Sequence, residues 1–174
     1  DYWDGLPKFE TADGAFELHF NGRIQLDFAY FDQPRDLEFL WDPIGEQVVF
    51  RDAEDGVDFR RVWFGIGGHV YDNIQWQIYW DITDNRNALL DTFLAFPDVP
   101  YVGSLKVGRF QEPFSLEEWT SNSNVTFLER ALPNALVPSY NTGFLANNAA
   151  LDDRVTWQLA LTRDTDSAGN GADD

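Results

Sequence analysis

The chain has 174 residues, of which 44% are hydrophobic and 24% charged, and 30 acidic residues against 12 basic ones give a formal net charge of −18. This charge argues against nucleic-acid binding, because neutralising phosphate groups requires clustered Lys and Arg. The absence of Cys excludes redox motifs and thiolate metal sites. No stretch approaches the length of a transmembrane helix, and the 15 Phe, 7 Trp and 6 Tyr argue against disorder.

The N-terminal segment, residues 1–14, precedes the first predicted strand. It starts at Asp1 without an initiator Met or the basic and apolar regions of a signal peptide, so we expect any signal peptide to have been removed. From Phe16 to Tyr30, apolar even positions alternate with mostly polar odd positions. This alternation predicts a strand of roughly 50 Å, far longer than the five or six residues usual in globular proteins.

Six further strands are predicted, over residues 60–71, 74–82, 89–96, 102–110, 141–149 and 155–162. Tight turns at residues 72–73, 97–100 and 152–153 alternate with longer connections, including residues 32–58 and 111–140, the latter with one helical turn at Leu116–Trp119. Short turns on one edge and long loops on the other are typical of transmembrane β-barrels. Seven strands cannot close such a barrel, and residues 164–174 form a polar loop, so we expect further strands after them.

The two faces of these strands predict two sets of residues. The apolar face carries aromatic residues at two heights with aliphatic residues between them, as expected of lipid-facing girdles; these are Phe16, Phe20, Phe28, Tyr30, Trp76, Trp80 and Trp157. The polar face is expected to line a pore; its candidates are Arg23, Gln25, Asp27, Arg61, His69, Gln75, Gln77, Asp81, Asp91, Lys106 and Arg109.

Four segments resemble one family. Residues 108–117 (GRFQEPFSLE) resemble the G-x-[FY]-x-x-P-F-x-x-E segment of the phosphate-selective porins O and P. Residues 127–130 (FLER) and 141–143 (NTG) resemble that family's glutamate–arginine pair and following glycine, and residues 22–27 (GRIQLD) and 59–68 (FRRVWFGIGG) resemble its first strands. Taken in this order, the segments are fairly specific. The chain, residues 1–174, is therefore interpreted as the N-terminal part of one all-β domain, an antiparallel up-and-down β-barrel.

The resemblance implies a bacterial outer-membrane porin of about sixteen strands, usually a homotrimer, that contacts outer-membrane lipid and lipopolysaccharide and passes small solutes or ions. It also implies that the third loop folds inward and narrows the pore. Counting connections independently makes residues 111–140 the third long loop. Glu117, Glu129 and Arg130 are then candidates for anchoring it to the wall; the other interpretation is a solvated surface loop.

Phosphate selectivity requires a ladder of cationic side chains in the lumen. Here the inward cations Arg23, Arg61, Lys106 and Arg109 are offset by Asp27, Asp81 and Asp91, and the chain has only two Lys. These residues favour a general or weakly selective pore over a phosphate-selective one.

Other functions are less well supported by the sequence. His19 and His69 lack Ser or Cys partners at catalytic spacing and are expected to line the lumen, so neither an enzyme nor a cofactor is predicted. Residues 164–169 resemble the start of a calcium loop, but Ala168 occupies a ligand position and the bidentate Glu is missing, so no metal site is predicted, although diffuse calcium binding by acidic loops stays open. The alternative function is a soluble β-sandwich that binds carbohydrate through Trp76, Trp80 or Trp157.

Overall fold

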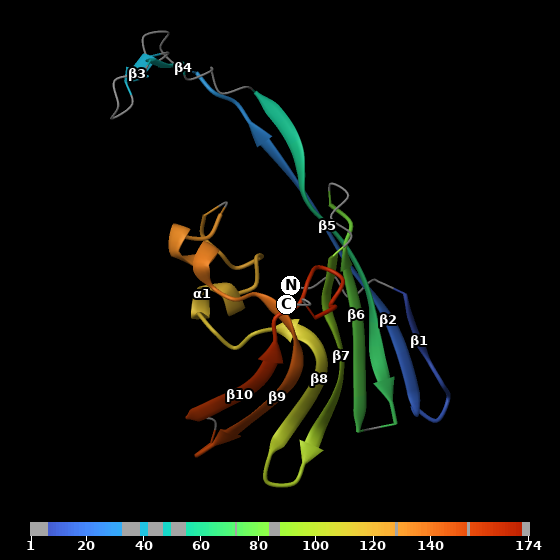
Figure 1. The fold of residues 1–174 in the computed structure, drawn as a ribbon. Coiled ribbons are helices and arrows are strands. Elements are labelled where there is room, and N and C mark those ends of the chain that lie inside the picture. The colour runs from blue at the N-terminus through green and yellow to red at the C-terminus, as the bar shows by residue number, and fades with distance from the viewer. Residues whose placement is uncertain are drawn as a thin grey trace.

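A computed structural model describes residues 7–32, 39–41, 47–49, 55–71, 73–83, 88–127, 129–152 and 154–171 (Figure 1). Eight antiparallel strands form one sheet in the order β1-β2-β5-β6-β7-β8-β9-β10, and β3 and β4 form a separate hairpin. The strands are β1 (Lys8–Glu10), β2 (Phe16–Ala29), β3 (Phe39–Trp41), β4 (Gln47–Val49), β5 (Gly56–Val70), β6 (Ile74–Asp81), β7 (Ala88–Val99), β8 (Gly103–Gln111), β9 (Tyr140–Ala150) and β10 (Val155–Arg163). Two short helices, α1 (Leu116–Trp119) and η3 (Leu132–Leu136), lie between β8 and β9.

The all-β antiparallel fold predicted from alternation is confirmed, and the seven predicted strands correspond to β2 and β5 to β10. The helical turn predicted at Leu116–Trp119 is α1. Four details differ. β1 was not predicted, because three residues are too few to show a period. β5 begins at Gly56, four residues before the predicted start, and β7 continues through Pro97 to Val99. The expected loop over residues 32–58 contains β3 and β4.

Tight turns gather at one end of the sheet, which we call the turn end. Four residues in or beside these turns have positive φ angles: Tyr71 (50°), Tyr101 (67°), Leu151 (56°) and Asp152 (54°). Such left-handed conformations let a short turn reverse the chain between antiparallel strands. The long connections therefore all leave the opposite end, which we call the loop end.

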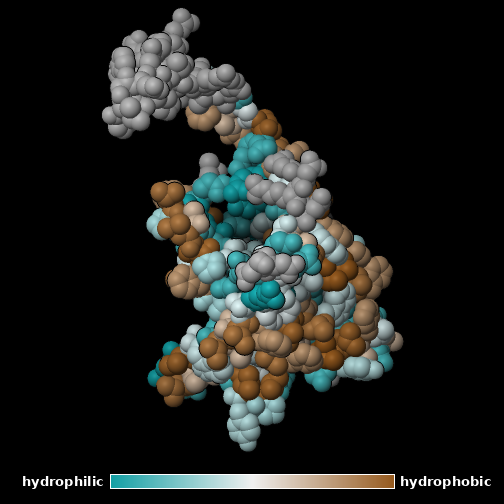
Figure 2. Space-filling view, viewed as in Figure 1, coloured by the Kyte–Doolittle hydropathy of each residue, from teal (hydrophilic) through white to brown (hydrophobic). Residues whose placement is uncertain are grey.

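The sheet encloses very little apolar core. Only Leu90, Ala95, Phe110 and Leu145 are buried hydrophobic residues among those described. Many large apolar side chains are instead exposed on one face, and in Figure 2 hydrophobic residues spread over the outer side of the sheet. An apolar face of this extent needs an apolar environment or another protein to cover it. The part of the chain that the structure describes includes no helix long and apolar enough to cross a membrane.

The seven girdle candidates lie on β2, β6 and β10 and just beyond the end of β2. Phe20, Phe64 and Trp80 lie side by side across β2, β5 and β6, with ring centroids 6.2 and 6.3 Å apart. Of the seven candidates, Phe16, Phe28, Tyr30 and Trp157 are exposed. Cross-strand aromatic pairs of this kind stabilise the sheet and fix its register.

One irregularity in β5 matters for the site. Gln25 pairs with Arg61 but Leu26 pairs with Phe59, so Arg60 is the extra residue of a β-bulge. A bulge interrupts alternation and can re-aim a side chain. The bulge accounts for how Arg60 and Arg61, which are neighbours in the chain, both reach groups on the same side of the sheet, as described below.

Candidate functional site

The connection between β8 and β9, which we call the loop (residues 112–139), is built around α1. The hydroxyl of Ser115 accepts a bond from the Glu118 N–H at 3.4 Å and caps the first turn. The Trp119 indole donates to the Glu112 carbonyl at 2.6 Å, and the Thr120 hydroxyl donates to the Leu116 carbonyl at 2.7 Å. A four-residue helix would not be stable alone, and these contacts fix its conformation.

Glu118 and Arg130 form the buried centre of the loop. The Glu118 carboxylate accepts bonds from Asn134 (2.6 Å), Gln111 (2.8 Å) and Ser139 (2.9 Å) and lies 3.3 Å from Arg130. Its side chain is 8% exposed. Burial by itself raises the pKa of Glu118, but the three hydrogen bonds and the Arg130 charge outweigh it and hold the pKa below its usual value.

Arg130 fastens the two halves of the loop together. Its guanidinium donates to the carbonyls of Glu117 (3.0 Å), Glu118 (3.0 Å) and Thr120 (2.9 Å). The Glu117 carboxylate accepts the N–H of Ala131 at 2.8 Å. Because these bonds join residues 117–120 to residues 130–131, the loop is a folded unit rather than an open surface strand.

Two contacts join the loop to strands on the far side of the sheet. Glu129 accepts two bonds from Arg60 on β5, and Arg23 on β2 donates to the Ser123 hydroxyl at 2.7 Å. The Arg60 bond is the dominant cause that lowers the pKa of Glu129. The loop leaves the sheet from β8 and β9, so these contacts carry it past β6 and β7, over the polar face.

A cavity of about 780 Å³ lies between the loop and the sheet, which we call the arginine cavity. In Figure 2, hydrophilic residues gather in the hollow beside the loop. The guanidinium carbons of Arg23 and Arg61 lie 5.3 and 5.8 Å from the Trp63 ring centroid, within the range of a cation–π contact. Arg61 also donates to the Gln25 side chain at 2.7 Å. The wall of this cavity is therefore positively charged and partly aromatic.

A glycine shapes this wall. Gly65 pairs with Tyr79, and a side chain at position 65 would collide with the Tyr79 ring. The ring occupies the space that a side chain at position 65 would fill and meets Trp63 edge-on, with centroids 5.9 Å apart. This contact leaves the Trp63 ring in place beneath the two arginines.

The arginines of this site differ in whether a carboxylate neutralises their charge. Arg60 and Arg130 are ion-paired with Glu129 and Glu118. Among the described residues, neither Arg23 nor Arg61 has a carboxylate within ion-pair distance. Unneutralised guanidinium groups beside an open cavity are suited to attracting anions or polar oxygen atoms.

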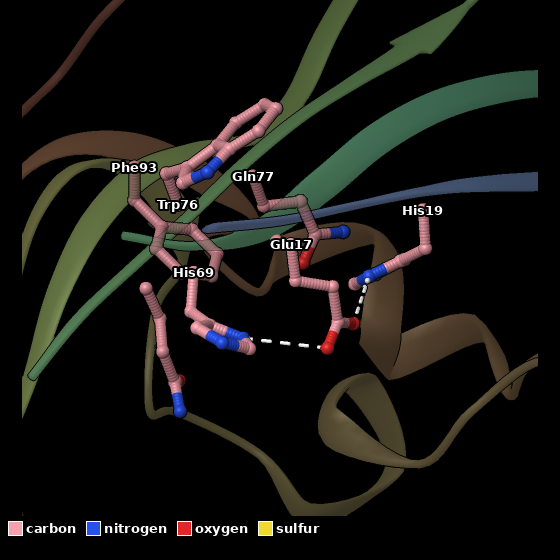
Figure 3. A pocket seen from close by; sticks show the side chains of 8 residues that line it. Glu17, His19, His69, Trp76, Gln77 and Phe93 are labelled. Carbon is pink, nitrogen blue, oxygen red and sulfur yellow. Dashed lines mark hydrogen bonds and ion pairs between the residues drawn. The ribbon is translucent and has the colours of Figure 1, made fainter. Parts of the chain in front are cut away.

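A second, smaller cavity of about 450 Å³ lies at the turn end, and we call it the histidine pocket (Figure 3). It contains the predicted pore residues His69, Gln75 and Gln77, together with Glu17 and His19. Glu17 lies between the two imidazoles, 3.1 Å from His19 and 3.4 Å from His69.

The remaining pore candidates lie in other surroundings. Asp27 accepts a bond from Gln25 at 3.2 Å, and Asp81 accepts the Thr83 N–H at 2.9 Å. Lys106 places its ammonium 3.9 Å from the Phe93 ring centroid, on the strand next to that of Asp91.

Arg109 is buried and lies apart from the arginine cavity. It donates to the Leu89 carbonyl at 2.7 Å and to the Thr165 hydroxyl at 2.5 Å. These contacts connect β8 to β7 and to the segment that follows β10.

Comparison with known proteins identifies the family. The sequence pattern described as "Phosphate-selective porin O and P" matches residues 18–172. The chain belongs to this family. Porin O of Pseudomonas aeruginosa is 30% identical over 136 residues, covering 76% of this chain and 28% of that protein. An uncharacterized protein of Caulobacter vibrioides is 27% identical over 174 residues, covering 98% of this chain and 32% of that protein. The chain thus spans about a third of the length of these relatives.

The predicted resemblance to this family is confirmed. The eight-stranded antiparallel sheet agrees with part of a porin β-barrel. Membership of this family does not favour the carbohydrate-binding β-sandwich. The described residues contain no group of three or more His, Asp or Glu arranged to hold a metal ion.

Three residues of the site were missed by reasoning from sequence. Glu118 was overlooked in favour of its neighbour Glu117, because only the folded loop shows which of the two is buried. Arg60 was missed because strict alternation assigned it to the other face. Trp63 could have been found, since it alternates in phase with Arg61 on the polar face of the predicted strand.

Proposed function

We propose that the protein is a passive diffusion channel of the bacterial outer membrane for small hydrophilic solutes and ions. The observation that supports this most strongly is the position of the loop, which is attached to β2 and β5 through Arg23 and Arg60 and covers the polar face of the sheet. In a closed barrel of about sixteen strands, this loop would narrow the lumen.

The proposed channel is weakly selective for anions. Arg23, Arg61 and Asp81 line the arginine cavity, and Asp27 lies on the same strand as Arg23. Because opposite charges alternate along the wall, neither sign is strongly excluded. The full protein is proposed to be a homotrimer in contact with outer-membrane lipid and lipopolysaccharide.

Conductance of the full-length protein in a planar bilayer tests this function. Under a KCl gradient we expect a small reversal potential of the sign that indicates anion preference. Arg61→Glu should move it toward cation preference, because the substitution replaces a cation with an anion in the cavity. Arg154→Glu, at the turn between β9 and β10, makes the same change of charge outside the arginine cavity and is the matched control.

Two outcomes would contradict the proposal. If the folded full-length protein gives no conductance, it is not a channel. If Arg61→Glu and Arg154→Glu shift the reversal potential equally, the arginine cavity does not lie on the ion route.

A further inference from the structure

The segment that follows β10, residues 164–171, turns back across the loop end of the sheet, and we call it the return segment. Two strands, β9 and β8, separate β10 from β7, yet the Leu89 N–H at the start of β7 donates to the Ser167 carbonyl at 2.9 Å. The Thr142 hydroxyl on β9 donates to the Gly169 carbonyl at 3.4 Å. In Figure 1 this red segment lies beside the loop end of β7. The return segment therefore contacts strands other than the one that it follows.

The return segment is also bonded within itself. The Asp166 carboxylate accepts the N–H groups of Ala168 at 2.9 Å and Asn170 at 2.8 Å. Thr165 forms an isolated β-bridge with Gly171, which joins the two ends of the segment. Carboxylate bonds to the following backbone are the usual way in which Asp fixes a turn. The segment therefore has a defined shape with which to contact the sheet.

Arg109 holds the return segment from β8. Its buried side chain donates from Nε to the Leu89 carbonyl at 2.7 Å and from Nη1 to the Thr165 hydroxyl at 2.5 Å. Among the described residues, no carboxylate lies within ion-pair distance of Arg109. A buried guanidinium without a counter-charge is costly unless its donors meet acceptors. Arg109 therefore needs the acceptors that β7 and the return segment provide, which makes it suited to positioning that segment.

The same hydroxyl connects the return segment to the base of the loop. The Thr165 hydroxyl and N–H lie 3.4 and 3.0 Å from Oδ1 of Asn141, which is the second residue of β9. The Asn141 amide donates to the Glu112 carboxylate at 2.8 Å. Glu112 begins the loop, and its carbonyl accepts the Trp119 indole of α1. A continuous series of hydrogen bonds thus runs from Arg109 to α1, and members of such a network affect one another.

We propose that the return segment is a second element that positions the loop, and that Arg109 and Thr165 are positioning residues acting through Asn141. The loop is then held at two places, on the far wall through Arg23 and Arg60 and at its base through the return segment. A cavity of about 610 Å³ lies between the return segment and the end of the loop. The shape of the loop end of the channel therefore depends on both segments.

Cross-linking tests the path of the return segment. Leu89 and Ser167 are joined through backbone atoms, so Leu89→Cys combined with Ser167→Cys leaves their contact in place. In the detergent-solubilised full-length protein, we expect a short bismaleimide to join the two thiols in most molecules, detected as linked peptides after digestion. Leu89→Cys with Thr156→Cys, at the turn end of β10, is the matched control and should give almost no cross-link. A folded Leu89–Ser167 double variant that forms no cross-link would overturn the proposal.

Proteolysis tests the coupling to the loop. Thr165→Val removes the hydroxyl but keeps the shape of the side chain, and cleavage within residues 112–139 should become roughly 2- to 10-fold faster, the factor expected for one lost hydrogen bond. Thr165→Ser keeps the hydroxyl and should restore the original rate. Ser167→Ala, which leaves the Ser167 carbonyl intact, is the matched control and should cause no change. In an Asn141→Ala background, Thr165→Val should add little, because its acceptor is already absent.

This inference rests on the proposed channel function for one consequence. In planar bilayers, Thr165→Val should increase the current fluctuations of the open channel without moving the reversal potential, because no charge changes. Equal cleavage of Thr165→Val and Ser167→Ala would overturn the positioning role, as would additive effects of Thr165→Val and Asn141→Ala. If the folded protein gives no conductance while the cross-link and the coupling are intact, the channel function is overturned and the positioning role stands.

Discussion

Arginine residues have different surroundings in the loop and in the wall of the arginine cavity. On the loop side, Arg130 is buried against Glu118 and three carbonyl groups. On the wall, Arg23 and Arg61 lie over Trp63, with a hydroxyl or an amide as their hydrogen-bond partner. A neutralised arginine organises the backbone around it, whereas an unneutralised one keeps its charge available. In a chain of net charge −18, this arrangement places positive potential in the cavity despite the excess of acid.

Removing Glu118 should have the largest effect on the loop side. Glu118→Ala leaves Arg130 buried without its carboxylate and removes the acceptor of Asn134 and Ser139, while Gln111 keeps only its bond to the Glu118 carbonyl. Breaking a buried pair in this way costs about 3–5 kcal/mol. We expect proteolysis within residues 112–139 of the full-length protein to become much faster. Glu117→Ala, whose side chain makes one exposed bond, is the matched control and should cost about 1 kcal/mol. Equal protease sensitivity of the two variants would show that burial of Glu118 does not hold the loop.

Acid should loosen the loop for the same reason. The pKa of Glu118 is lowered in the folded protein, so its contribution to stability is fully present above the ordinary carboxyl pKa of about 4.3 and is lost as the pH falls through the lower folded value. The protease sensitivity of the loop should therefore rise only in strong acid, and Glu118→Gln should remove this dependence. A loop that loosens near neutral pH would contradict the assignment to Glu118.

Replacing Trp63 should test the wall side. Trp63→Leu removes the ring beneath Arg23 and Arg61, a contribution of about 0.5–2 kcal/mol for cation–π contacts. With their orientation less restricted, the two guanidinium groups should attract anions less specifically, and the reversal potential should move part of the way that Arg61→Glu moves it. Trp157→Leu, on the apolar face of β10, is a matched substitution that should leave the reversal potential unchanged. A change at Trp157 as large as that at Trp63 would mean that the aromatic platform is not what orients the charges.

The smallest effect is expected where loop and wall meet. The Arg60–Glu129 pair is partly exposed, with 57% of the Glu129 side chain accessible to solvent, and exposed pairs contribute at most about 1 kcal/mol. Glu129→Gln should therefore change loop proteolysis only slightly, and the change should diminish at high salt because mobile ions screen surface charges. An effect as large as that of Glu118→Ala would show that this pair, rather than the buried centre, positions the loop.

Particular residues show how far sequence reasoning reached. The strand from Phe16 was predictable because alternation over fourteen or fifteen residues has one interpretation, and its observed bounds are Phe16–Ala29. The helical turn at Leu116–Trp119 was predictable from local pattern. The side of the sheet that Arg60 reaches was not predictable, because no local sequence preference marks the place where the bulge inserts one residue. The burial of Glu118 instead of Glu117 was also not predictable. It depends on how the loop folds back so that Glu118 meets Gln111 and Ser139.

The composition of the chain, with its excess of acidic residues and its many aromatic residues, does not say where these residues lie. The sequence by itself determined the strand type, the order of the strands, the side of each strand that is apolar, and the family, because period-two alternation and local motifs are properties of short segments. Only the tertiary structure decided which charges are neutralised. Ion pairs such as Arg60 with Glu129, 69 residues apart, depend on strand register and on the path of the loop. Register and loop path arise from contacts between distant segments, which no local pattern contains.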